Sequence, residues 1–309
     1  MSFSSDIKNE LCKLKVRSKE QQLAVLCGLT QTCSTLRLSK NPRVIYQSES
    51  EPVVRLVASL SENLYALDAE VGVREQEHRS IPLSIVLVSG PKSKDMLMDT
   101  GILHADSDGV SFQKQIPENI LKNESDRACF LRGAFLGSGS CSSPEVAYHL
   151  EISSRTEDFA ASMAEIICSF GLSAKCSLRK GRHLVFISGD DVAGFLALIG
   201  ATNASLHLED IRAQKDYRNY LNRTNNCETA NIGKTVNASY TQLHAIEILE
   251  QHMHLTELPG PLYEAARLRM QHPQATLQEL ADLAEIGKSG MNHRMTRIIA
   301  LAKEYESLQ

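Results

Sequence analysis

The segment Leu131-Arg-Gly-Ala-Phe-Leu-Gly-Ser-Gly139 indicates a duplicated fold, because a second segment of the same character begins 105 residues before it. The earlier stretch reads Leu26-Cys-Gly-Leu-Thr-Gln-Thr-Cys-Ser34. Residues with no side chain, or with only a methyl group, let two helix backbones approach closely. Both stretches hold such residues, namely Gly28, Gly133, Ala134 and Gly137.

A longer repeat surrounds these two stretches. Gly90 is followed by Gly101, and Gly189 by Gly200, at an offset of 99 residues. In each copy an apolar, β-branched run precedes the first glycine and a short helical pattern follows it. A tandem duplication explains both copies. We therefore predict an α+β domain with pseudo-two-fold symmetry over residues 1–215, in which each half (about 1–110 and 120–205) has the order αββαββα.

Local signals place several elements of the two halves. Thr156 is a candidate N-cap for an amphipathic helix that ends near Phe170, because its hydroxyl can accept a bond from a first-turn amide. Lys180-Gly181 is typical of a tight hairpin turn. In the first half, residues 53–67 have the pattern of a helix and residues 70–74 that of a strand.

The paired stretches resemble the LAGLIDADG motif of homing endonucleases, in which two such helices pack face to face. Active nucleases of that family carry a carboxylate at the eighth motif position of each helix, and the two carboxylates hold a divalent metal. The resemblance implies which positions of this chain correspond to them. Here those positions are Cys33 and Ser138, and the sixth positions are Gln31 and Leu136. None is a suitable Mg²⁺ ligand. We therefore expect no DNA cleavage, no catalytic residues and no bound metal.

Composition excludes some classes of protein. The chain has 309 residues, a net charge of −4, 5% aromatic residues and no tryptophan. A wholly disordered chain and a uniformly basic nucleic-acid coat are both excluded, so any nucleic-acid site must be a local patch. No export signal or membrane-spanning run is recognisable, which predicts a cytoplasmic protein. The eight scattered cysteines are expected to be small core residues.

The character of the sequence changes after Asp210. Residues 212–229 are polar and read as a linker or an interdomain helix. An apolar stripe at helical spacing follows, which predicts an amphipathic helix. Its members are Val236, Tyr240, Leu243, Ile246, Leu249 and Met253.

Three short helical segments come after the break at Leu258-Pro-Gly-Pro261. Pro261 suits the first turn of a helix that ends at His272-Pro273. Thr276 and Glu279 form a capping-box pattern that opens a second helix. A turn ending in Gly287 leads to a third. This punctuation predicts a helix-turn-helix at about residues 275–306, within a helical DNA-binding domain of residues 222–309.

The third segment carries the strongest functional signal. Between Lys288 and Lys303 there are four cations and no acid, although the whole chain is negative. A helical wheel places groups suited to base edges and phosphates opposite the apolar stripe. An ordinary solvated helix in a three-helix bundle is the alternative. The predicted DNA-binding residues are Lys288, Ser289, Asn292, His293, Arg294, Thr296 and Arg297.

Other patterns are better explained without a ligand. The histidines His244, His252 and His254 lack a further zinc ligand at compatible spacing. The run Asp106-Ser-Asp108-Gly109 lacks the later oxygen ligands of a calcium loop and is read as a turn. We therefore expect no cofactor and no metal.

The joint pattern resembles the WhiA-type regulators of Gram-positive bacteria, on residues 131–140, 226–237 and 288–294 above all. The resemblance implies a non-enzymatic, nucleoid-associated transcriptional regulator of cell division and chromosome segregation, with a role in sporulation in some relatives. Its partners would be double-stranded DNA and a transcription or cell-division protein bound by the LAGLIDADG-like domain. A divalent-metal endonuclease and a protein- or ligand-binding module are the alternatives.

Overall fold

A computed structural model describes residues 2–37, 42–75, 82–106, 109–112 and 116–307 of the chain. The chain forms two compact units, Met1–Gln214 and Lys215–Gln309. None of the helices in the described ranges combines the length and apolar character needed to cross a membrane.

The first unit repeats one order of elements, as predicted. Each half has a helix, two strands, a helix, two strands and a helix. The first half comprises α2 (Lys19–Cys33), β1 (Ser34–Arg37), β2 (Arg43–Ser48), α3 (Glu51–Tyr65), β3 (Asp68–Arg74), β4 (Leu83–Ser89) and α4 (Ser93–Asp99). The second comprises α5 (Glu124–Ser138), β7 (Gly139–Cys141), β8 (His149–Ser154), α6 (Glu157–Cys168), β9 (Lys175–Arg179), β10 (Arg182–Ser188) and α7 (Asp191–Ile199).

The two four-stranded sheets have equivalent topologies, β1-β2-β4-β3 and β7-β8-β10-β9, and all their neighbouring strands are antiparallel. Alternate residues of each central strand are buried, as in a sheet covered on one face. In the second sheet, for example, Ile152 pairs with Val185 and both are buried. One continuous core joins both halves of the unit.

Local signals in the sequence match these elements closely. The side chain of Thr156 accepts a hydrogen bond from the backbone N–H of Phe159, at 3.4 Å, and so caps α6. Lys180 and Gly181 have φ values of 51° and 74°, which is the left-handed conformation that a tight hairpin turn requires. Both predictions are confirmed.

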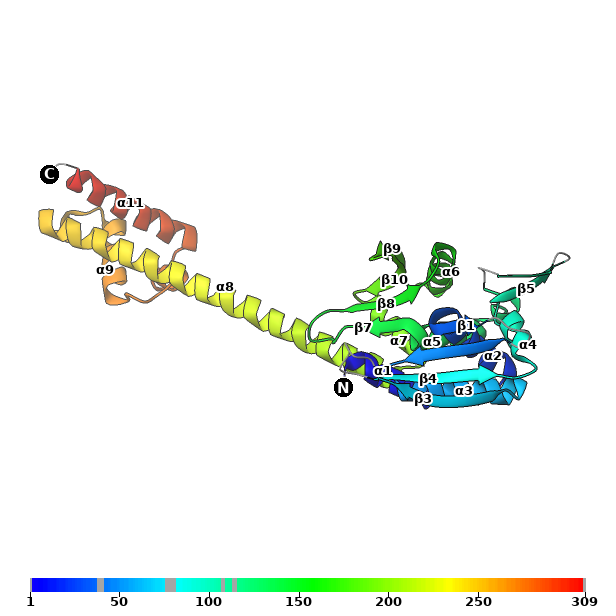
Figure 1. Cartoon of the computed structure of the whole chain (residues 1–309). Helices are drawn as coiled ribbons and strands as arrows, with labels where there is room; N and C mark the ends of the chain where they lie inside the picture. Colours follow the sequence, from blue (N-terminus) through cyan, green and yellow to red (C-terminus); the bar gives the residue numbers. More distant parts are fainter. Residues whose placement is uncertain (1, 38–41, 76–81, 107–108, 113–115, 308–309) are drawn as a thin grey trace. The chain divides into compact units, whose positions relative to one another are not determined.

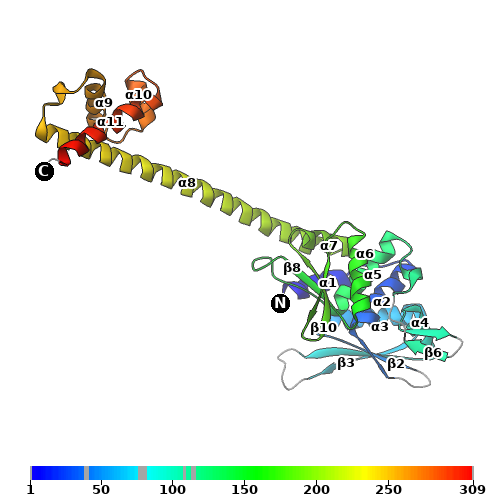
Figure 2. The same ribbon diagram turned by 90° about the horizontal axis from the view of Figure 1, so that it is seen from above.

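The backbones of α2 and α5 meet at their glycines, side by side in Figures 1 and 2. A methyl group added to Gly28 would overlap the carbonyl oxygen of Phe130, and one added to Gly133 would overlap that of Val25. At Gly137 it would meet the hydroxyl of Thr32. The glycines are therefore required by the close contact between the two helices.

Helix α1 (Phe3–Cys12) was not predicted, and it ties distant parts of the unit together. The Ser4 hydroxyl accepts a bond from the backbone N–H of Cys141 and donates to its carbonyl oxygen, at 2.6 and 2.9 Å. The Glu10 carboxylate accepts bonds from the backbone N–H groups of Asn203 and Ala204, at 2.8 and 3.1 Å. A hairpin of β5 (Leu103–Asp106) and β6 (Gly109–Phe112) and a short 3-10 helix, η1 (Glu118–Ile120), separate the halves.

The cysteine prediction is partly wrong. Cys27, Cys129 and Cys141 are buried, but Cys168, Cys176 and Cys227 are exposed. An apolar run in the sequence does not show which of its residues faces outward at the end of a helix, and Cys168 is the last residue of α6.

The stretch after Asp210 is helical rather than a linker, because α8 runs without a break over Thr202–His252. The predicted stripe is correct only in its later part. Ile246 and Leu249 are buried, whereas Val236 and Tyr240 are 59% and 72% exposed. Within the second unit, Ser239 of α8 is buried, and its hydroxyl donates to the carbonyl oxygen of Pro273.

Three helices complete the second unit: α9 (Gly260–Gln271), α10 (Leu277–Leu283) and α11 (Lys288–Glu306), after a 3-10 helix, η2 (Leu255–Glu257). They share a core with the last turns of α8. Alanines at the contacts, Ala245, Ala265, Ala266 and Ala281, allow these short helices to pack closely. In α9, Leu268 is buried, whereas Met270 is 43% exposed.

Arg269 is buried in this small core, with only 1% of its surface exposed. Its Nε donates to Oε1 of Gln242 on α8, at 2.8 Å, and its Nη1 donates to the carbonyl oxygen of Ala275, at 2.6 Å. The carbonyl oxygens of His272 and Pro273 also lie 3.4 Å from Nη1. Burial lowers the pKa of the guanidinium. Arg269 therefore holds the loop that leads into α10 against α8.

Substitution of Gly133 with alanine should lower the free energy of unfolding by about 1–3 kcal/mol, because the methyl group meets a backbone oxygen that cannot move alone. Gly72→Ala is the control, since nothing lies within 4 Å of the place that its methyl group would take. Denaturant titration measures both variants. Equal effects of the two substitutions would show that the helix contact is not tight.

Replacing Arg269 with methionine should cost about 3 kcal/mol, because it leaves Gln242 and the carbonyl of Ala275 without a donor. Arg267→Met, on the exposed face of the same helix, should change stability by less than about 0.5 kcal/mol. Calorimetry on the full chain provides the comparison. Equal melting behaviour of the two variants would contradict the anchoring role of Arg269.

Candidate nucleic-acid interface

The helices α10 and α11 are joined by a tight turn. The predicted capping box opens α10: the backbone N–H of Thr276 donates to Oε2 of Glu279 at 2.7 Å, and that of Glu279 donates to the Thr276 hydroxyl at 3.2 Å. The turn itself relies on Glu285, which has a φ of 52°. Gly287, which marks the turn in the sequence, has a φ of −73° and is the N-cap of α11.

The two faces of α11 differ as the sequence predicts. Met291, Met295, Ile298 and Ala302 are buried in the core of the second unit. Six of the seven predicted DNA-binding residues are exposed together on the other side: Lys288, Ser289, Asn292, His293, Thr296 and Arg297. The Thr296 hydroxyl donates to the carbonyl oxygen of Asn292 at 2.8 Å, which fixes its orientation.

Arg294 has a different environment from the other six. Its Nη1 lies 2.9 Å from Oε2 of Glu264 on α9, and the side chain is only 20% exposed. This ion pair fastens α11 to α9. Lys288, Arg297 and Lys303, by contrast, have no carboxylate oxygen within 4.0 Å in the described part of the chain.

Gly287 has no side chain, so the first turn of α11 begins without a side-chain cap. The first N–H groups of a helix have no partner inside the helix and attract anions. Lys288 lies at the same end. The exposed face of α11 therefore combines free N–H groups, amide, hydroxyl and imidazole side chains, and unpaired cations.

The two positions that correspond to the metal-binding carboxylates of the LAGLIDADG motif hold neutral groups. Cys33 ends α2, and its Sγ lies 3.2 Å from the carbonyl oxygen of Leu29. Burial raises the pKa of this thiol to about 12, so it remains protonated at neutral pH. The Ser138 hydroxyl donates to the carbonyl oxygen of Ser153 at 2.6 Å. A protonated thiol and a neutral hydroxyl are poor ligands for Mg²⁺, which proteins bind through carboxylate oxygens.

Positive charge surrounds the same position. Lys8 on α1 and Arg155 both act on the Cys33 thiol through their charges. Arg155 also donates to the backbone carbonyl oxygen of Ser34, across the two halves. Cations at this point oppose the binding of a further cation.

The remaining ligand candidates of the sequence do not form a site. Across the described ranges, no group of three or more His, Cys, Asp or Glu side chains is arranged to hold a metal. His244, His252 and His254 are exposed. Asp108, in the run that superficially resembles a calcium loop, lies outside the described residues.

Both units of the chain match models of known protein domains. The model of the WhiA LAGLIDADG-like domain matches residues 127–218, and that of the WhiA C-terminal HTH domain matches residues 221–302. The chain is 35% identical to the probable cell division protein WhiA of Clostridium acetobutylicum, over 98% of both chains. It is 36% identical to the protein of that name from Clostridium perfringens, again over 98% of both.

Solved structures support the fold. The crystal structure of full-length DUF199/WhiA from Thermotoga maritima matches with a TM-score of 0.63 and 23% identity, over 98% of this chain and 99% of that one. The N-terminal LAGLIDADG domain of DUF199/WhiA matches with a TM-score of 0.52 and 22% identity, over 64% of this chain and 90% of that one. This chain, with a degenerate LAGLIDADG-like fold and a helix-turn-helix, belongs to the WhiA family.

Proposed function

We propose that this protein is a DNA-binding transcriptional regulator that acts in cell division and chromosome segregation. In this proposal α11 reads the major groove of duplex DNA, and the duplicated domain positions DNA or recruits a protein. The observation that carries it is the exposed face of α11, where unpaired cations and hydrogen-bonding side chains lie opposite the buried methionines.

The chemistry of that face suits duplex DNA. Asn292 can bond the edge of adenine, and Arg297 the edge of guanine or a phosphate. Lys288, Ser289 and the uncapped first turn suit a phosphate. His293 and Thr296 lie on the same face. Arg294 instead pairs with Glu264 on α9 and so holds α11 in place.

The domain limits belong to the same proposal. We assign residues 222–309 to the DNA-reading domain, with its helix-turn-helix at 275–306, and residues 1–215 to the duplicated domain, with halves 1–110 and 120–205. A protein that reads chromosomal DNA would act in the cytoplasm, at the nucleoid.

Removing Arg297 should weaken binding to duplex DNA by about 1–3 kcal/mol if it contacts a base, and should flatten the salt dependence if it contacts phosphate. Fluorescence anisotropy of a labelled genomic fragment bound by the protein, over a series of salt concentrations, measures both. Arg267→Ala is the control, because Arg267 is an exposed cation on α9 outside this face. Unchanged affinity after Lys288 and Arg297 are both replaced by alanine would contradict the proposal.

The endonuclease alternative has its own test. Supercoiled plasmid incubated with the protein and Mg²⁺ or Mn²⁺ should stay intact, because the Cys33 thiol and Ser138 hydroxyl cannot replace two carboxylates. Appearance of nicked plasmid that depends on these two residues would overturn this part of the account.

A further inference from the structure

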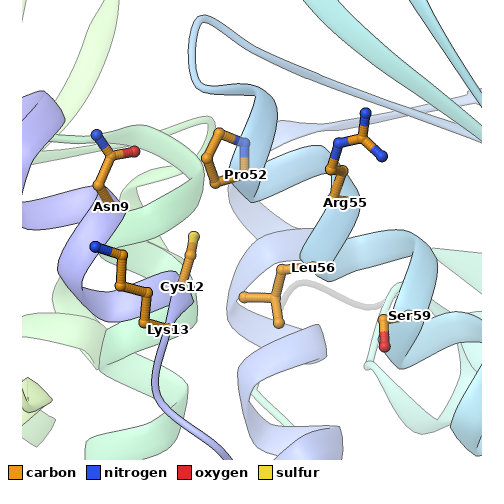
Figure 3. A pocket seen from close by; sticks show the side chains of 7 residues that line it. All are labelled: Asn9, Cys12, Lys13, Pro52, Arg55, Leu56 and Ser59. Atoms are coloured by element: carbon orange, nitrogen blue, oxygen red, sulfur yellow. The ribbon is translucent and has the colours of Figure 1, made fainter.

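Two adjoining hollows lie along α3 in the first unit, on the side where α1 and the segment after it run. The first has a volume of about 610 Å³ and is shown in Figure 3; it is lined by Asn9, Cys12, Lys13, Pro52, Arg55, Leu56 and Ser59. The second, of about 340 Å³, extends toward α5. Leu56 and Ser59 line both hollows, so the two form one groove, called here the α1/α3 groove.

The floor of the α1/α3 groove is aliphatic. Leu56 and Cys12 form it in the first hollow, and Leu14, Val16 and Leu60 in the second. Burial raises the pKa of the Cys12 thiol to about 11, so this side chain contributes a neutral, apolar surface. None of the described residues that line the groove has an aromatic ring.

The rim of the groove is cationic. Among the described residues, five cations and no carboxylate line the two hollows, in a chain whose net charge is −4. The acids Asp6 and Glu10 line a further hollow, which meets the first at Asn9 and Lys13. Arg55 pairs with Glu51, and Arg132 donates to the carbonyl oxygen of Ile199 at 2.6 Å. Lys13, Lys15 and Arg17 are exposed, and within the described ranges no carboxylate lies within 4.0 Å of them.

This combination favours a protein segment over a nucleic acid. Single-stranded nucleic acid is held by aromatic side chains that stack on its bases, and the described lining of the groove offers none. An aliphatic floor would instead bury leucine-like or aromatic side chains of a ligand. The exposed cations would meet carboxylates beside those side chains and steer the encounter.

We propose that the α1/α3 groove docks an acidic amphipathic segment of a partner protein, with one or two large apolar side chains in the hollows and carboxylates against Lys13, Lys15 and Arg17. This inference rests on the proposed function, in which the duplicated domain recruits a protein. It adds the place on that domain and the chemistry of the partner.

The test uses a fluorescent amphipathic peptide of about four helical turns, with leucines on one face and glutamates on the others. Full-length protein is titrated into it. The variant Lys13→Glu, Lys15→Glu, Arg17→Glu should bind at least about tenfold more weakly. The matched control, Lys175→Glu, Arg179→Glu, Arg182→Glu, makes the same charge change on exposed residues of β9 and β10 and should stay within about twofold of the parent.

A second variant tests the hollows without changing charge. Ser59→Phe fills the point where the two hollows meet and should weaken peptide binding to a similar extent. A peptide with serines in place of its leucines should bind weakly to every form of the protein. Equal losses with the matched control, or undiminished binding of the serine peptide, would show unspecific charge attraction and overturn the proposal.

The same set of variants tests whether another ligand occupies the groove and whether α11 binds DNA independently of it. Competition by single-stranded DNA that is lost in the Lys13, Lys15, Arg17 variant would assign the groove to nucleic acid. Self-association of the protein that is lost in that variant would assign it to a second copy. Either result overturns the proposal. Binding of duplex DNA should be unchanged by all groove variants. Failure of the groove proposal, seen in peptide binding, can therefore be distinguished from failure of the proposed function of α11, seen in duplex-DNA binding.

Discussion

The close contact between the α2 and α5 backbones is the constraint on which the first unit depends. Gly28 and Gly133 each face a backbone oxygen of the opposite helix, so the helices cannot move apart without leaving a void or move closer without overlap. Each helix is followed directly by the first strand of its own sheet, β1 or β7. The contact therefore sets the relation of the two sheets and the pseudo-two-fold symmetry of the duplicated fold.

The same contact explains how a nuclease-like fold can exist without nuclease chemistry. It places the ends of α2 and α5, with Cys33 and Ser138, at the positions that the LAGLIDADG resemblance assigns to metal-binding carboxylates. Both side chains are instead hydrogen-bonded to backbone carbonyl oxygens, and cations stand beside Cys33. Packing and catalysis are thus separable requirements: the glycines maintain the fold, and the loss of acids removes the metal chemistry.

The sequence predicts what depends on local pattern. The Thr156 cap, the Lys180-Gly181 turn, the capping box and the buried stripe of α11 all follow from neighbouring residues, and the structure confirms them. The duplication follows from the repetition of such local patterns about 100 residues apart, and the equivalent topology of the two sheets agrees with it. The full length of α8 was missed because its polar, exposed middle part shows no apolar periodicity. Helix α1 does carry apolar residues at helical spacing, Phe3, Ile7 and Leu11, and Ile7 and Leu11 are buried in the core, so its pattern could have been predicted. The exposure of Val236 and Tyr240 depends on where the packing partners of α8 begin, which no local pattern reveals.

In the candidate site, too, local features could be predicted from the sequence, whereas contacts between distant residues could not. The faces of α11 follow from a helical wheel, but the pairing of Arg294 with Glu264 joins residues 30 positions apart. The burial of Arg269 is equally long-range, since its partner on α8 is 27 positions away. The α1/α3 groove combines segments that are distant in the sequence, so its cations could not be grouped from the sequence alone.

Site-specific photocrosslinking can show whether α11 is the element that reads DNA. A photoreactive amino acid is placed at Asn292 on the exposed face of α11 or, in a second protein, at Arg43 on an exposed strand position of the first sheet. If α11 reads DNA, duplex DNA should crosslink to the position of Asn292 far more than to that of Arg43. Crosslinking at Arg43 with none at Asn292 would contradict it.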